Sequence, residues 1–176
     1  KKAQTGGEAL TTDLNATATI AGKGFALAEI ATQAEVTLRP STIGPVAVDR
    51  GRLAARLTEG QLHITEFTLD AKDTTATVRG DIGTSGAYPG QLTYDLHVGD
   101  VAPWLSLAEQ QGTGTLHLTG KAQGSLDNLQ LQGELRTQNL RVATTTIQDG
   151  RVAYQLENIG QPQPAGTMTA TLRNID

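Results

Sequence analysis

Apolar and polar residues alternate along most of this chain. In QLTYDLHV (91–98) the apolar side chains fall on even positions, from Leu92 to Val98, and the polar side chains fall on odd ones. A period of two places successive side chains on opposite faces of a β-strand. The same alternation recurs in residues 14–20, 34–38, 53–57, 129–135 and 152–156. The pattern predicts an all-β fold: a long, curved, mostly antiparallel sheet with one apolar face.

Turn-forming residues separate these segments at intervals of roughly 8 to 15 residues. The expected turns are 22–24, 40–45, 49–51, 59–60, 71–73, 83–90, 111–114, 124–128, 149–150 and 160–166. Between them the chain has room for about a dozen strands of ordinary length.

The alternation changes parity within QLHITEFTL (61–69). Leu62 and Ile64 are apolar at even positions, whereas Phe67 and Leu69 are apolar at odd positions. One extra residue near Thr65 and Glu66 would return the later side chains to the same face. We therefore expect a β-bulge there, which would also bend the sheet.

One segment, DVAPWLSLAEQ (100–110), departs from the period of two. Asp100 is a candidate cap, Pro103 suits a first helical turn, and the apolar residues have helical spacing. This pattern predicts a short helix over about residues 102–109. Because the helix carries Trp104, the only tryptophan of the chain, we expect it to pack on the apolar face of the sheet.

Short internal repeats suggest that the sheet is built from a repeated unit. GQLHIT (60–65) returns as GTLHLT (114–119), and VRGDI (78–82) returns as LQGEL (131–135). A sheet made in this way can be extended at both ends. The chain opens on Lys1 and Lys2 rather than Met and stops after a strand-like stretch, so we interpret residues 1–176 as a single β-rich segment of a longer repetitive protein.

Composition and charge narrow the functional classes. The net charge is −4, and no run of basic residues exceeds two, which argues against a nucleic-acid partner. The chain has no cysteine, so it forms neither disulfides nor thiolate metal sites. It contains no signal-peptide pattern and no apolar run long enough for a membrane span.

The candidate catalytic and metal-binding residues do not form a site. His63, His97 and His117 each stand between two apolar residues, so the period of two places them on the polar face, where we expect solvated histidines rather than zinc ligands. The glycine-rich segments lack the spacing of a phosphate-binding loop, and GTSGAYPG (83–90) is one residue short of a nucleophile elbow. We therefore expect neither catalysis nor a cofactor.

The apolar face has two interpretations. Two sheets could bury their apolar faces against each other in a β-sandwich. Alternatively, a single sheet folds over on itself and leaves an open groove with an aliphatic lining. The extendable repeats and the few aromatic residues favour the groove. Its predicted lining consists of Leu62, Ile64, Phe67, Leu69, Val78, Leu92, Tyr94, Leu96, Leu116, Leu118, Leu129, Leu131, Leu135, Val152, Tyr154 and Leu156.

Residues 100–156 resemble the C-terminal region of the TamB and AsmA-like family. The resemblance rests on the helix with Ala102, Pro103, Trp104 and Leu105, on G-x-L-x-L-x-G from Gly114, on G-S-L from Gly124, and on alternating leucines into Gly133. It implies a β-taco with a hydrophobic interior, part of a periplasmic bridge between the inner and outer membranes of a Gram-negative cell. It also implies lipid acyl chains as ligands, and TamA as an outer-membrane partner in the assembly and translocation of outer-membrane proteins.

Two other functions remain open from the sequence. An exposed sheet edge could bind strands of outer-membrane protein clients as a chaperone does. The chain could also be a structural module of an adhesin.

Overall fold

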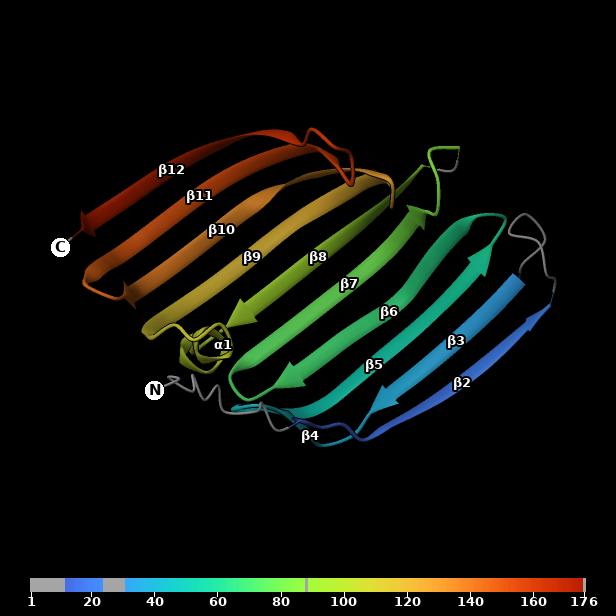
Figure 1. Ribbon diagram of the computed structural model, residues 1–176, viewed down its shortest axis with the longest axis horizontal. Coiled ribbons are helices and arrows are strands. Elements are labelled where there is room, and N and C mark those ends of the chain that lie inside the picture. The colour runs from blue at the N-terminus through green and yellow to red at the C-terminus, as the bar shows by residue number, and fades with distance from the viewer. Residues whose placement is uncertain (1–11, 24–30, 88, 176) are drawn as a thin grey trace, which may run out of the picture.

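The computed structural model describes residues 12–23, 31–87 and 89–175, which form one open sheet of 12 strands and one short helix (Figure 1). The elements in chain order are β1 (Thr12–Asp13), β2 (Ala16–Lys23), β3 (Ala31–Leu38), β4 (Ser41–Ile43), β5 (Val46–Thr58), β6 (Gln61–Ala71), β7 (Thr74–Gly83), β8 (Gly90–Val98), α1 (Ala102–Leu107), β9 (Gly112–Ser125), β10 (Asn128–Val142), β11 (Thr145–Ile159) and β12 (Ala165–Ile175).

The strands follow one another as an antiparallel meander. From β4 to β12 each strand pairs with its neighbours in the chain, and β5 also pairs with β3, which pairs with β2. Among the described strands, the one parallel pairing joins β7 to β9 at Gly83 and Ser125. Strands β2 and β12 therefore form the two long edges of the sheet (Figure 1).

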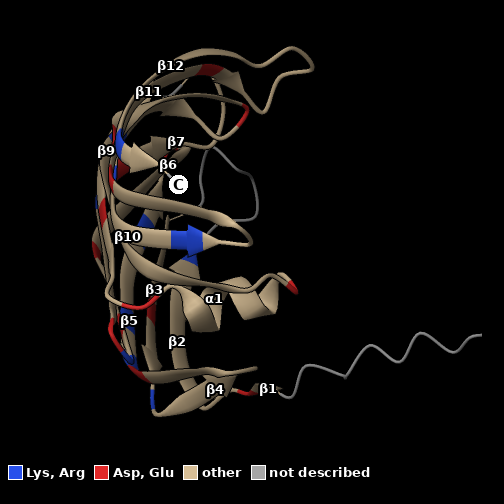
Figure 2. Cartoon of the chain, turned by 90° about the vertical axis from the view of Figure 1, so that its left-hand side faces the viewer, with Lys and Arg blue, Asp and Glu red and all other residues tan. Residues whose placement is uncertain are grey.

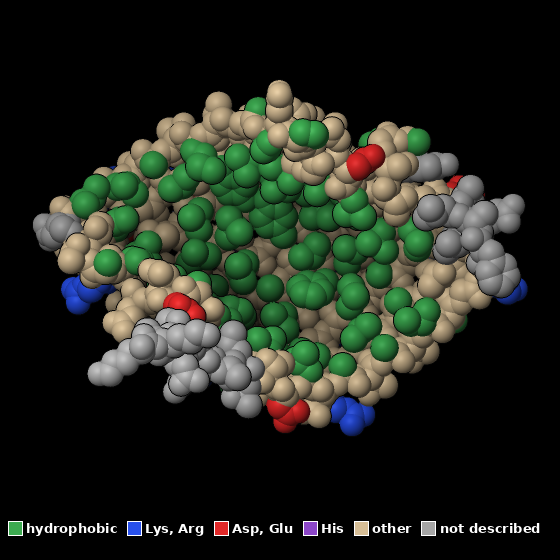
Figure 3. All heavy atoms as spheres, in the orientation of Figure 1, with side chains coloured by type: hydrophobic (Ala, Val, Ile, Leu, Met, Phe, Trp, Pro, Cys, Tyr) green, Lys and Arg blue, Asp and Glu red, His purple; other side chains and the backbone are tan. Residues whose placement is uncertain are grey.

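The sheet is curved, and α1 lies within its concavity (Figure 2). Hydrophobic side chains cover the concave face, and the charged side chains visible in this view lie at its rim (Figure 3). No second sheet covers this face in the described residues, because all their strands belong to one sheet. The all-β, curved-sheet prediction is confirmed, and the β-sandwich alternative is wrong.

The predicted bulge is present in β6. On one side Ile64 pairs with Ala55 and Glu66 pairs with Ala54, which leaves Thr65 without an opposite residue. On the other side Ile64 pairs with Gly80 and Phe67 with Val78. The bulge thus keeps the apolar side chains before and after it on one face.

Two of the expected turns are wrong, because they lie inside strands. Asp49 occupies a second bulge, between Val48 and Arg50 of β5, so the chain continues without reversing. Gly150 lies in the middle of β11, where a Cβ atom would come within 2.5 Å of the Thr137 Oγ1 atom. This glycine allows two strands to approach closely rather than forming a turn.

Other turn boundaries also differ from the prediction. Strand β4 (Ser41–Ile43) lies inside the turn expected at 40–45. Strand β9 begins at Gly112, inside the turn expected at 111–114. The turn between β10 and β11 falls at Ala143 and Thr144, and Ala143 has a φ of 51°. Neither residue of this turn is a glycine or a proline, so composition did not reveal it.

Helix α1 forms where expected and ends earlier than residue 109. Its N-cap is Val101, and the Ala102 amide donates to the Asp100 carboxylate over 3.0 Å. Glu109 has a φ of 56°, a left-handed conformation that is incompatible with a continuing helix. The helix packs against the small buried cluster of Val46, Val48 and Ala71.

Candidate ligand-binding face

The predicted lining residues lie on strands β6 to β11 and share the concave face. Within each regular stretch of strand they occupy alternate positions, and in β6 the parity changes at the bulge. The register places them opposite one another on neighbouring strands. All of them are partly buried, and none belongs to the fully buried core. Partial exposure of a whole apolar face follows from the absence of a second layer over the described residues.

Cross-strand pairing arranges these side chains in rows that run across the sheet. One row is continuous and almost entirely aliphatic over seven strands. It consists of Leu69, Ala76, Leu96, Leu118, Leu135, Val152 and Ala170. Neighbouring side chains in such a row are about 4.5–5.5 Å apart, so their apolar surfaces merge into a continuous strip.

A second row runs parallel to the first, four residues away along each strand and five on the bulged strand β6. It consists of Ile64, Gly80, Leu92, Ala122, Leu131 and Leu156. Two small residues, Gly80 and Ala122, lie among the larger ones of this row. Neither row contains a charged side chain.

A third row lies between these two and carries aromatic residues. Phe67 pairs with Val78, which pairs with Tyr94, and Tyr154 lies further along the same row. Between the two tyrosines the row contains only Gly120 and Gly133, which face each other on β9 and β10. The tyrosines extend toward each other across both glycines, and their hydroxyl oxygens are 2.5 Å apart.

Helix α1 covers one part of the concave face. Trp104 and Leu107 pack against Val46, Val48 and Ala71. The Trp104 indole N–H donates a hydrogen bond of 2.9 Å to the Thr74 hydroxyl, which satisfies a buried polar group at the end of β7. The helix thus buries the strand ends beneath it near one end of the sheet (Figure 1), and hydrophobic side chains stay visible over the rest of the concave face (Figure 3).

The three histidines lie on the convex face, exposed as expected. His97 and His117 face each other on β8 and β9, with ring centroids 5.7 Å apart, and Asp95 lies 3.2 Å from His117. His63 pairs with Asp81. These side chains are about half exposed, and no group of three metal-binding side chains occurs in the described part of the chain.

The convex face also carries a network of arginines and carboxylates. Glu134 accepts hydrogen bonds from Arg136 and Arg151. The hydrogen bond from Arg136 is the main reason that the pKa of the Glu134 carboxyl is lowered; desolvation opposes this shift, and the hydrogen bond from Arg151 adds to it. Arg136 and Arg151 are 62% and 63% exposed, so this network is largely solvated and adds little to stability.

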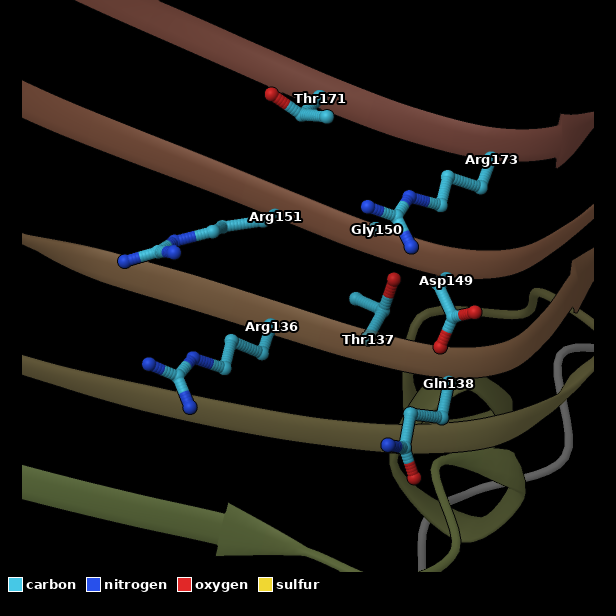
Figure 4. Close-up of a pocket in the computed structure, with 8 residues that line it drawn as sticks. All are labelled: Arg136, Thr137, Gln138, Asp149, Gly150, Arg151, Thr171 and Arg173. Carbon is cyan, nitrogen blue, oxygen red and sulfur yellow. The ribbon is translucent and has the colours of Figure 1, made fainter.

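Arg136, Arg151 and Arg173 line a shallow depression of about 370 Å³ beside this network (Figure 4). The other polar residues of its lining are Thr137, Gln138, Asp149 and Thr171. Because Glu134 already engages two of the arginines, the depression offers little free positive charge. It is a shallow hollow on the convex face.

The rows of the concave face are mainly apolar. It offers aliphatic surface, one pair of phenolic hydroxyls and no charged group in its rows. Within the described ranges no helix has the length and apolar character that crossing a bilayer requires. No protein-family model, curated protein or solved structure matches this chain.

Proposed function

We propose that this chain is a segment of a hydrophobic groove that shields the acyl chains of lipids from water. The observation that carries the proposal is the concave face, where parallel rows of aliphatic side chains are partly exposed across at least six strands. Contiguous apolar surface of this extent on a soluble domain is typical of a binding site. The role is one of binding and conduction, without catalysis.

Energetics supports hydrocarbon as the ligand. Two acyl chains carry about 30 methylenes, and burial stabilises each by about 0.8 kcal/mol, so roughly 24 kcal/mol opposes their passage through water. A continuous apolar strip removes most of that barrier. Since the rows hold no charged residue, no charged side chain would bind a lipid tightly at one strand and stop it from moving to the next.

The resemblance of residues 100–156 to the TamB and AsmA-like family supports a specific setting for this role. In that setting the chain lies in the periplasm as part of an inner-membrane-anchored bridge, phospholipids are the ligand, and a TamA-like protein is the outer-membrane partner.

Lipid retention by the purified protein tests the proposal. Native mass spectrometry of the wild type should detect bound phospholipid, and Leu96→Glu or Leu131→Glu should reduce it at least tenfold, because each places a charge in an aliphatic row. Matched controls are Gln91→Glu and Gln132→Glu, which lie on the same strands and point to the exposed convex face. Equal lipid loss in controls and row variants, or no lipid in the wild type, would contradict the proposal.

The sheet edges favour a second candidate, in which a client strand pairs with β12. Every described residue of β2 and β12 is exposed, including Ile20 and Met168, at 70% and 67%. An edge of this length is a ready template for another strand. A proline scan from Thr167 to Thr171 tests this role: client binding should fall at alternate positions, those whose N–H groups face outward, while lipid retention stays unchanged.

A further inference from the structure

The hydroxyl pair of Tyr94 and Tyr154 stands out from the rest of the concave face. Their hydroxyl oxygens are 2.5 Å apart although the residues are 60 positions apart in the chain and three strands apart in the sheet. The two tyrosine side chains can meet because only Gly120 and Gly133, which have no side chains, lie between them. A Cβ atom on Gly120 would come within 2.5 Å of the Tyr94 hydroxyl, and one on Gly133 would come equally close to the Tyr154 hydroxyl. The two phenol groups therefore lie directly over the glycine backbones.

Counting donors and acceptors shows that the pair retains hydrogen-bonding capacity. Two phenols supply two O–H donors, and the bond between them uses one. In the described part of the chain neither hydroxyl has any other hydrogen-bond partner. One O–H group is therefore free to donate to a molecule bound in the groove. Hydrogen-bond cooperativity strengthens this donor, because its own oxygen accepts a hydrogen bond from the neighbouring phenol.

The surroundings of this donor make it selective. Leu92 and Leu131 lie in the row on one side of the pair, and Leu96 and Leu135 lie in the row on the other. A hydrocarbon ligand that covers these rows removes water from the hydroxyls. A ligand with a carbonyl oxygen then replaces the lost water, whereas a plain hydrocarbon leaves the O–H without a partner, which is costly in an apolar site.

We propose that the Tyr94 and Tyr154 hydroxyl pair is a recognition site for the carbonyl oxygen at the head of an acyl chain. The proposal rests on the hydrocarbon-binding function proposed above and adds a point of chemical specificity to it. The carbonyl could belong to an ester or to a free carboxylate. Because the neighbouring rows contain no lysine or arginine to balance a carboxylate, the neutral ester is the better match.

Binding of three ligands with similar chain length tests this site. Radiolabelled methyl palmitate, palmitate and octadecane, each delivered from cyclodextrin, are compared on the wild type, Tyr94→Phe, Tyr154→Phe and the double variant. The double variant should bind methyl palmitate roughly five- to tenfold more weakly than the wild type and bind octadecane equally well. Each single variant keeps one hydroxyl free to donate, so each should retain most of the preference for the ester.

A vibrational measurement separates a direct hydrogen bond from an indirect effect on packing. The infrared band of methyl palmitate labelled with ¹³C at its carbonyl should shift to lower frequency on the wild type and on both single variants, and should stay unshifted on the double variant. Loss of octadecane binding in the double variant would overturn the proposal, because it would assign the tyrosines a packing role.

The remaining outcomes distinguish this proposal from the broader one. If the wild type binds octadecane and methyl palmitate but the double variant keeps its preference for the ester, the recognition site is wrong and the groove stands. If palmitate alone depends on the hydroxyls, the ester assignment is wrong. If the wild type binds none of the three ligands, the groove function fails and the recognition site fails with it.

Discussion

Gly120 and Gly133 show how much of the concave face depends on the absence of a side chain. They face each other on adjacent strands, and the tyrosine pair occupies the space above them. A Cβ atom on Gly133 would clash with the Thr119 carbonyl oxygen and lie 2.5 Å from the Tyr154 hydroxyl. One neighbour is backbone of the adjacent strand, so local side-chain movement cannot relieve the crowding.

We predict that Gly133→Ala lowers the free energy of unfolding by about 1–3 kcal/mol through overpacking. Urea unfolding followed by far-ultraviolet circular dichroism measures the change. Gly86→Ala is the matched control, because nothing lies within 4 Å of a Cβ atom there, and it should leave stability nearly unchanged. Equal stability of the Gly133→Ala variant and the wild type would show that the two strands adjust freely.

Tyr94 links the hydroxyl pair to the alkaline stability of the protein. Burial, followed by the hydrogen bond with Tyr154, raises the pKa of Tyr94 above its ordinary value of 10.0. A raised pKa in the folded state means that the unfolded chain loses this proton first as the pH rises. The stabilisation is therefore complete below pH 10.0 and declines above it.

We predict that Tyr94→Phe makes the free energy of unfolding less dependent on pH above about pH 10, because the titrating group is removed. Urea unfolding at a series of pH values from about 8 to 11.5 gives both slopes. Identical slopes for the variant and the wild type would contradict the assignment of the raised pKa to Tyr94.

At the scale of single elements, the bulge in β6 sets the register of the whole strand. Ile64 and Phe67 both face the groove although two residues separate them. Deletion of Thr65 would leave one residue between them, which is ordinary strand alternation. Deletion of Thr68, in a regular part of the same strand, would instead move Phe67 or Leu69 to the convex face.

We predict that the Thr65 deletion variant folds with a loss of less than about 2 kcal/mol, whereas the Thr68 deletion variant unfolds or aggregates. Circular dichroism and size-exclusion chromatography distinguish the two results. Equal damage from both deletions would mean that the bulge itself, and not the alternation around it, is essential to the sheet.

The elements differ in how far the sequence could predict them. The alternation in 91–98 and the parity change at Thr65 predicted β8 and the bulge because one face of each strand is apolar. Asp49 and Gly150 misled the prediction, since both residue types favour turns and are equally suited to a bulge or a close strand approach. The choice between these roles depends on the neighbouring strand, which local sequence does not specify.

The same limit applies to the candidate site. Alternation placed Tyr94 and Tyr154 among the predicted lining residues, where the structure also places them on the concave face. Their hydrogen bond depends on the register of four strands and on two glycines within it. That coincidence is a property of long-range pairing, so no local pattern predicted it.

At the scale of the whole molecule, the sheet ends in two exposed edges. On β12, Met168 is 67% exposed, and Leu172 and Ile175 are 41% and 54% exposed. Natural proteins commonly protect such edges with lysine or proline. Between Ala165 and Ile175 the strand has neither, and Arg173 is its only charged residue.

We predict that the isolated chain self-associates as its concentration rises and that Met168→Lys reduces this association at least several-fold. Sedimentation velocity over a hundredfold range of concentration measures the effect. Leu126→Lys is the matched control, because Leu126 is 55% exposed in the turn between β9 and β10, away from the edges. If both variants reduce association equally, general hydrophobicity rather than the edge is responsible.

Because the apolar rows run across the strands, the length of the apolar face depends on the number of strands. Each row takes one side chain from every strand it crosses, so its span is set by hydrogen-bonded neighbours about 4.8 Å apart and not by the covalent backbone. Inserting another hairpin would therefore lengthen each apolar row by about 10 Å, whereas adding residues to the existing strands would only widen the apolar face. The apolar face can therefore be lengthened by duplicating hairpins, with no change in the residues of the existing strands.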